Sequence, residues 1–136
     1  MLLTKASEYA LLSIALIAQS KEPQDTKNLA EALKIPKSFL AKILQSLARS
    51  EILISYKGAK GGFILSKTPA EISVLDIIKS VEIKSANVFE CSDSQNDCPG
   101  GNLKASCCFI WPCLNKLQGK VDDFLDSVKL EDLLNI

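Results

Sequence analysis

The most reactive side chains in this sequence belong to five cysteines that lie close together. All of them fall between residues 91 and 113, and no cysteine occurs elsewhere in the chain. An odd number of clustered cysteines disfavours a disulfide framework, because each disulfide uses two thiols. Thiolates are soft ligands for iron–sulfur clusters and zinc, and they also undergo redox chemistry. The sequence therefore predicts a metal or redox site made from Cys91, Cys98, Cys107, Cys108 and Cys113.

Zinc and a simple thiol switch are the alternatives to an iron–sulfur cluster at these cysteines. Common zinc modules carry paired Cys-x-x-Cys motifs, and that spacing is missing here. Acid–base enzymes usually rely on histidine, and the chain contains none. The carboxylates also form no recognisable catalytic pair, so we expect a protein that is not an enzyme. Redox turnover at Cys107 and Cys108 is the enzymatic alternative.

The composition predicts a folded, globular chain that can hold these cysteines. With 136 residues, 47% hydrophobic and 24% charged, the chain can form one domain with a core and an added assembly element. The longest early apolar run, residues 10–18, is too short to span a bilayer and lacks a cleavage site. We therefore expect a cytoplasmic protein without a signal peptide or a membrane segment.

Charge is distributed unevenly along the chain, although the net charge is zero. Residues 1–69 contain ten lysine and arginine side chains against five acidic ones, so this half carries +5 and the remainder carries −5. A basic half is typical of a part that contacts nucleic acid, and an acidic half suits a separate sensor or partner region. The sequence therefore favours a DNA-binding head followed by an acidic region.

Three helices are predicted in the basic half, from apolar residues spaced three and four apart. The first covers residues 4–20, and a short second helix is capped by Asp25 or Thr26. Pro36 ends the following turn and suits the start of the third helix. The predicted buried face of the third helix consists of Leu40, Ile43, Leu44 and Leu47. Its opposite face is small, polar and cationic and consists of Lys37, Ser38, Ala41, Lys42 and Gln45.

A short helix, a tight turn and a second helix with such a face form the helix-turn-helix pattern, whose second helix enters the DNA major groove. An ordinary solvated helix pair is the alternative. The strand-like runs Ile52–Tyr56 and Phe63–Leu65 follow directly, joined by a glycine-rich tip that carries Lys57 and Lys60. Glycines allow close approach to phosphates and the lysines add counter-charge, so this hairpin is interpreted as a DNA-contacting wing.

The acidic half is predicted to contain two helices separated by a long loop. Ser73 and Asp76 fit a capping box that opens the first of them. Residues 82–106 are polar and contain Pro99-Gly100-Gly101, so we predict a loop there. Pro112 is expected to start the last helix. An apolar stripe on that helix predicts pairing with a second copy, with packing on the chain's own core as the alternative. The stripe consists of Leu114, Leu117, Val121, Phe124 and Val128.

These elements together predict a mainly α-helical fold with a small β-hairpin wing. Residues 1–82 would form a winged helix-turn-helix DNA-binding domain, and residues 83–111 a cysteine-bearing cluster loop. Residues 112–136 would form a dimerisation helix and a C-terminal segment. Gly119 costs that helix about 1 kcal/mol relative to alanine and would permit a close helix crossing.

Several short runs carry a resemblance to one family of regulators. They are Leu3–Lys5, Tyr9–Leu11, Leu29–Glu31, Ser38–Leu40, Ile43–Leu44, Lys57–Phe63 with Leu65, Ile72–Ile77 and Leu130–Leu133. In this combination they resemble the winged-helix regulators of the IscR and NsrR group, the Rrf2 family. The resemblance covers nearly the whole chain and is most specific where the wing and the cysteine segment occur together. It implies a bacterial homodimer that binds palindromic, double-stranded promoter DNA.

The resemblance also implies which cysteines hold an iron–sulfur cluster, of two or four irons. Cys91 and Cys98 match the first two ligands. Counting back from Leu130 in the register of the family places the third ligand at Cys108, with Cys107 beside it as a rival. A thiolate-bearing loop is chemically suited to such a cluster.

The fourth ligand differs among the proteins that this chain resembles. In the IscR-like members a histidine follows the third cysteine, and this chain has Trp111 at that position. In some NsrR-like members a carboxylate on the first helix of the other subunit completes the site. The resemblance therefore implies Glu8 of the partner subunit as the fourth ligand, ahead of Cys107 or Cys113.

The function implied by this resemblance is a transcription regulator, such as a repressor, controlled by its cluster. The cluster would sense redox state, nitric oxide or iron and cluster supply, and the proteins that assemble clusters would be further partners. A winged-helix regulator that uses a thiol switch or zinc is the alternative. The side chains expected to read bases are Lys37, Ser38, Lys42 and Gln45, and those expected to hold the DNA backbone are Lys57 and Lys60.

Overall fold

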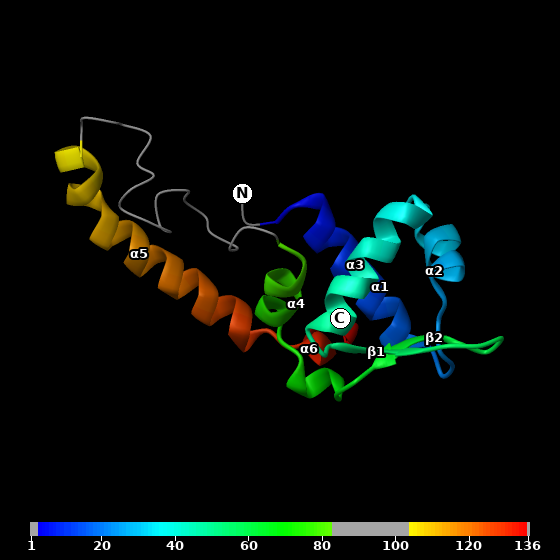
Figure 1. Cartoon of the computed structure of the whole chain (residues 1–136). Helices are drawn as coiled ribbons and strands as arrows, with labels where there is room; N and C mark the ends of the chain where they lie inside the picture. The colour runs from blue at the N-terminus through cyan, green and yellow to red at the C-terminus, as the bar shows by residue number, and fades with distance from the viewer. Residues whose placement is uncertain (1–2, 83–103, 136) are drawn as a thin grey trace.

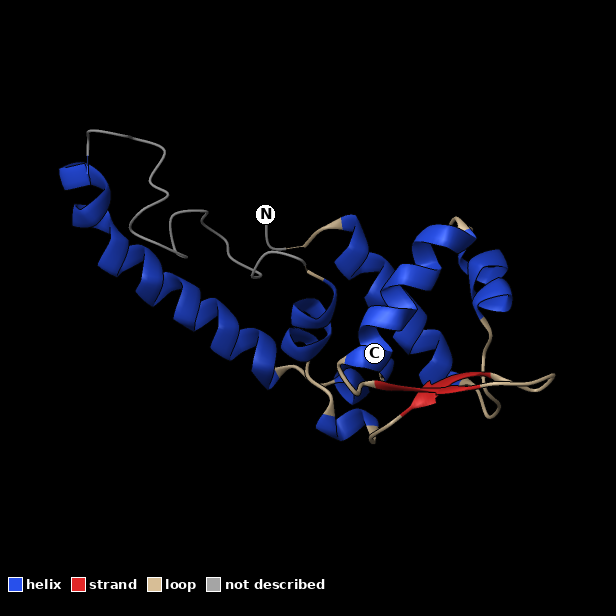
Figure 2. Ribbon diagram, viewed as in Figure 1, coloured by secondary structure: helices blue, strands red, loops and turns tan. Residues whose placement is uncertain are grey.

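The computed structural model describes residues 3–82 and 104–135, with side chains for residues 3–82 and 112–135 (Figure 1). These residues are mainly helical, with a single two-stranded sheet in the part that is described (Figure 2). In chain order the elements are α1 (Lys5–Gln19), α2 (Thr26–Leu33), α3 (Lys37–Arg49), β1 (Leu53–Tyr56), β2 (Gly62–Leu65), the 3-10 helix η1 (Pro69–Glu71), α4 (Val74–Val81), α5 (Lys104–Ser127) and α6 (Leu130–Leu134).

The turn between α2 and α3 forms where the sequence predicts it. Asp25 caps α2, because its carboxylate accepts a hydrogen bond from the Asn28 amide at 2.7 Å. Lys34 ends α2 in the left-handed conformation, with φ 56°. Pro36 lies immediately before α3, where its ring fixes φ and its missing N–H costs nothing. The predicted buried face of α3 is confirmed, since Leu40, Ile43, Leu44 and Leu47 are all buried.

The predicted capping box of α4 is confirmed as well. The Ser73 hydroxyl accepts a hydrogen bond from the Asp76 amide at 3.0 Å, and the Asp76 carboxylate accepts one from the Ser73 amide at 3.2 Å. Each contact satisfies an N–H group that would otherwise lack a partner at the helix start.

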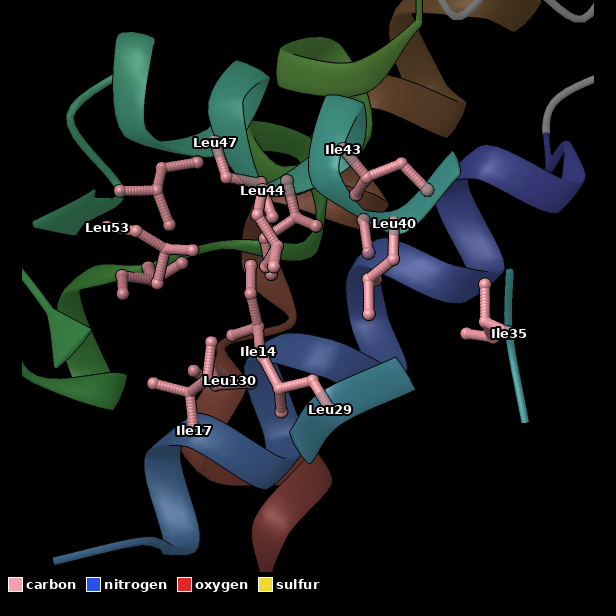
Figure 3. Close-up of a cluster of buried hydrophobic side chains, with 14 of the residues drawn as sticks. Ile14, Ile17, Leu29, Ile35, Leu40, Ile43, Leu44, Leu47, Leu53 and Leu130 are labelled. Carbon is pink, nitrogen blue, oxygen red and sulfur yellow. The ribbon is translucent and has the colours of Figure 1, made fainter. Parts of the chain in front are cut away.

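The hydrophobic core lies between α1, α2, α3, the hairpin, α4 and α6 (Figure 3). Burying one such leucine or isoleucine contributes about 1.5–3 kcal/mol. Leu130 belongs to α6, so the last part of the chain completes a core built mostly by the first 80 residues. The side chains with less than 2% exposure include Ile14, Leu29, Leu40, Leu44, Leu47, Ile77 and Leu130.

The hairpin has the predicted antiparallel pairing, from Leu53 opposite Leu65 to Tyr56 opposite Gly62. Its strand bounds differ by one residue from the prediction. The chain before α2 also pairs with β2, because the Gln24 amide donates to the Phe63 carbonyl at 3.1 Å and the Phe63 amide donates to the Gln24 carbonyl at 2.8 Å. The three elements α2, α3 and the hairpin thus form a winged helix-turn-helix.

Gly62→Ala is expected to destabilise this winged domain. Gly62 has φ 151°, and an added Cβ would lie 2.6 Å from the backbone carbonyl carbon of Gln24. Overpacking of this kind typically costs about 1–3 kcal/mol, which thermal unfolding would measure. Gly58→Ala is the matched control, because Gly58 also has a positive φ, 111°, but nothing within 4 Å of an added Cβ. Equal losses in both variants would contradict a role for the contact with Gln24.

The helix α5 extends away from this body as a long projection (Figures 1 and 2). The prediction that the last helix starts at Pro112 was wrong, since α5 starts at Lys104 and contains Pro112 in its interior. Proline removes one N–H, the donor to the carbonyl four residues earlier, and the helix continues through that loss. Residues 104–111 are therefore helical and do not belong to a loop, so Cys107 and Cys108 lie on α5.

The C-terminal end of α5 packs on the body. Leu125 and Val128 contact Val74 and Ile78 of α4. Among the residues that the structure describes, no helix combines the length and the apolar character that crossing a membrane requires.

Candidate functional site

The polar face of α3 is accessible, as the sequence predicts. Lys37, Ser38, Lys42 and Gln45 are all exposed, while Ala41 is half-buried. The apolar residues on the other side of the same helix hold it against the core. This surface therefore presents two cations and two hydrogen-bonding side chains on a rigid element, which is what reading the edges of base pairs requires.

The tip of the hairpin presents the other two predicted cations. Lys57 and Lys60 are exposed and lie in the turn between β1 and β2. The Gly61 amide donates to the Gly58 carbonyl at 2.9 Å, which closes the turn. A Cβ on Gly61 would lie 2.5 Å from the Tyr56 carbonyl oxygen, so only glycine fits there. The tip is therefore a compact backbone loop with a lysine on each side of Gly58.

Glu8 lies in the first turn of α1 and is exposed. Its carboxylate pairs with Lys5, with 3.4 Å between Nζ and Oε2, and both side chains face solvent. Exposed pairs of this kind contribute about 0–1 kcal/mol. Glu8 could therefore leave Lys5 for another partner with little loss of folding stability.

The predicted cysteine ligands are only partly within the described structure. Cys113 is an exposed, free thiol on α5. The backbone of Cys107 and Cys108 belongs to α5, and their side chains lie outside the described residues, as do Cys91 and Cys98. Among the described residues, no three histidine, cysteine, aspartate or glutamate side chains gather in a way that could hold a metal ion.

The apolar stripe of α5 is divided between two environments. Val128 packs on α4, in agreement with the alternative of packing on the chain's own core. Leu117 is 44% exposed and Phe124 is 67% exposed. Gly119 is two residues from Leu117 and five from Phe124, so it lies on the side of the helix opposite the stripe. A second helix packed on the stripe would therefore not cross α5 at Gly119.

One polar cluster escaped the sequence prediction. The hydroxyls of Thr4 and Ser7 both donate hydrogen bonds to Oε1 of Glu82, at the end of α4. Ser7 has no exposed surface. A signal did exist, because Ser7 shares the apolar face of α1 with Ala10, Ile14 and Ile17, and a buried hydroxyl needs a partner. The partner, Glu82, lies 75 positions away in the sequence, so no local pattern indicated that Ser7 would contact it.

Comparison with known proteins identifies the family to which this chain belongs. The profile of the Rrf2 family, described as an iron-dependent transcriptional regulator, matches residues 3–136. The chain is 29% identical to the HTH-type transcriptional regulator IscR of Photorhabdus laumondii, across 99% of this chain and 80% of that protein. It is 28% identical to the HTH-type transcriptional regulator NsrR of Bacillus licheniformis, across 98% of this chain and 92% of that protein.

A solved structure supports the same fold. That of CymR, the global cysteine regulator of B. subtilis, superimposes with a TM-score of 0.69 at 23% identity, across 98% of this chain and 95% of that one. The resemblance inferred from the short sequence runs is therefore confirmed, and so is the expectation that the protein is not an enzyme. The chain belongs to the Rrf2 family of DNA-binding transcription regulators.

Proposed function

We propose that this regulator acts in the cytoplasm as a homodimer whose binding to promoter DNA is controlled by an iron–sulfur cluster. The ligands would be Cys91, Cys98 and Cys108, with Glu8 of the partner subunit as the fourth. The observation that supports this most is the group of five cysteines in a member of a family described as iron-dependent. Three thiolates and a carboxylate form a donor set that iron accepts.

The described part of the chain is compatible with this donor set. Glu8 is exposed and bound only by a weak ion pair with Lys5. Cys107 and Cys108 both lie on the backbone of α5, so the proposal takes Cys108 as the ligand and Cys107 as its rival. When bound, the cluster would supply a group whose charge and integrity change with oxidant, nitric oxide or iron supply.

DNA binding would use α3 for base contacts and the wing for the phosphate backbone. The four exposed polar side chains of α3 provide donors and acceptors for base edges. Lys57 and Lys60 at the wing tip can neutralise phosphates without reading sequence. Two such heads in a symmetric dimer would meet the two halves of a palindrome.

Replacing either wing lysine with alanine is expected to weaken DNA binding without changing sequence preference. Each phosphate contact releases counterions, so the slope of log affinity against log salt should fall by about 1 for each variant. Titration of labelled duplexes at several salt concentrations would measure this slope. Lys120→Ala, at an exposed position on α5, is the control and should leave it unchanged. An unchanged slope for both Lys57→Ala and Lys60→Ala would exclude the wing from phosphate contact.

Dimerisation would use the exposed part of the α5 stripe. Leu117 and Phe124 are exposed to solvent in the single chain. Exposed apolar side chains at helical spacing on a projecting helix are favourable sites for pairing with a second copy.

Anaerobic purification tests the proposal as a whole. The protein is used to select duplexes from random-sequence DNA, and iron, acid-labile sulfide and the visible spectrum are measured per chain. The dissociation constant for a selected duplex is then compared before and after the cluster is removed by chelation. Brown protein with both elements and a cluster-dependent affinity supports the proposal. Zinc without sulfide, or colourless protein after attempted reconstitution, would contradict it and favour a zinc or thiol regulator.

A further inference from the structure

The carboxylate of Glu82 joins the end of α4 to the start of α1. Oε1 of Glu82 accepts hydrogen bonds from the hydroxyls of both Thr4 and Ser7. Thr4 also caps α1, because its hydroxyl accepts a hydrogen bond from the Ser7 amide at 3.3 Å. An anionic group at this position is favoured by the partial positive charge of the helix N-terminus. One side chain therefore fixes the first turn of α1, the turn that also carries Glu8.

Glu82 occupies a particular place along the chain. It is the residue directly after α4, and its own amide donates to the Ile78 carbonyl at 3.1 Å. The next residues lead to Cys91 and Cys98. Glu82 is therefore the residue that joins α4 to the segment of the chain that carries these cysteines.

The same part of α1 is in contact with the helix that carries the predicted base-reading residues. Tyr9, two residues after Ser7, packs edge-to-face on Phe39 of α3, with ring centroids 5.7 Å apart at an interplanar angle of 86°. Phe39 directly follows Ser38 on the exposed end of α3. Such ring pairs contribute about 0.5–1.5 kcal/mol beyond burial and constrain geometry. The first two turns of α1 thus lie between Glu82 and the N-terminal end of α3.

We propose that Glu82 is a positioning residue that transmits the state of the cysteine segment to the DNA-reading helix through Thr4 and Ser7. This inference rests on the proposed cluster-controlled function. The Glu82 hydrogen bonds hold α1 in register with α4, and α1 in turn holds Phe39. Without them, changes at the cysteines alter the DNA affinity of α3 less than in the wild type.

The test measures how strongly the cluster changes the DNA affinity of the wild type, Glu82→Ala and Glu82→Gln. The dissociation constant for one selected duplex is measured in the cluster-loaded and the chelated protein, and the readout is the ratio of the weaker to the tighter of the two constants. Coupling of this type typically spans about 5–150-fold. The ratio is expected to fall toward 1 in Glu82→Ala. In Glu82→Gln it should recover part of its wild-type value, because the amide oxygen can still accept from both hydroxyls.

Glu71→Ala is the matched control. Glu71 also accepts a threonine hydroxyl hydrogen bond, from Thr68 at 2.9 Å, but lies in η1, away from α1. It should keep the wild-type ratio. If Glu82→Ala does not fold, Ser7→Ala removes one of the two donors and should lower the ratio in the same direction.

The outcomes separate the two proposals. A wild-type ratio of 1 would overturn cluster control and this inference together. A wild-type ratio above 1 that Glu82→Ala leaves intact would overturn the role of Glu82 alone. Equal weakening of both states by Glu82→Ala would also overturn it, because a purely structural role changes both affinities and leaves their ratio unchanged.

Discussion

Cys91→Ala is expected to bleach the protein. Under the proposed ligation this substitution removes one of three thiolates, and an alanine methyl group cannot bind iron. Losing even a group that only hydrogen-bonds to a ligand typically lowers the metal affinity of a site about 10–100-fold, so losing a ligand itself should lower the iron and sulfide bound per chain. Anaerobic absorbance together with iron and sulfide analysis would measure the loss.

Cys113→Ala is the matched control for this experiment. The thiol of Cys113 is exposed on α5, and the proposed ligand set does not include it. This variant should stay brown. Bleaching by Cys113→Ala with retention of the cluster in a Glu8→Ala variant would contradict the assignment of Glu8. A Cys91→Ala variant with full cluster content would contradict the ligand set as a whole.

Phe124→Asp is expected to convert the proposed dimer into monomers. Phe124 is 67% exposed in the single chain, so the substitution should cost the fold of one chain little. In a dimer it would place a charge against apolar side chains and remove a large buried ring, which should raise the dimer dissociation constant about 100-fold or more. Sedimentation analysis across a range of protein concentrations would measure it. DNA affinity should fall with it, because two linked heads gain about 10²–10⁴ from binding together.

Asn115→Asp provides the control with the same added charge. Asn115 is exposed and lies two residues before Leu117, on the side of α5 opposite the stripe. It should leave the oligomeric state unchanged. If both variants stay dimeric, the proposed contact through the outer stripe of α5 is wrong.

The winged head was predictable because local rules and tertiary packing agree there. The apolar spacing in α3 places Leu40, Ile43, Leu44 and Leu47 on one face, and all four are buried. Pro36 and the glycines of the hairpin tip restrict the backbone to turns at those points. The exposed positions of Lys37 and Lys42, which are predicted to contact DNA, follow directly because they lie away from the buried face.

The acidic half was less predictable, because its structure depends on distant contacts. Pro112 was interpreted as a helix start, but a long helix tolerates the loss of one hydrogen bond when the residues on both sides are helical. The return of Leu130 to the core involves partners far away in the sequence. The contact of Glu82 with Ser7 spans 75 positions, and no local pattern reports it.

The attachment of α5 has a mechanical consequence. Its C-terminal end is held by two backbone hydrogen bonds, from the Val74 amide to the Val128 carbonyl at 2.9 Å and from the Leu130 amide to the Ile72 carbonyl at 2.8 Å. The helix has 24 residues, which at a rise of 1.5 Å per residue is a length of about 36 Å. When a helix of that length tilts by about 5° at the end that is held, its far end moves by about 3 Å. Small angular changes beside α4 therefore become large movements of the backbone that carries Cys107 and Cys108.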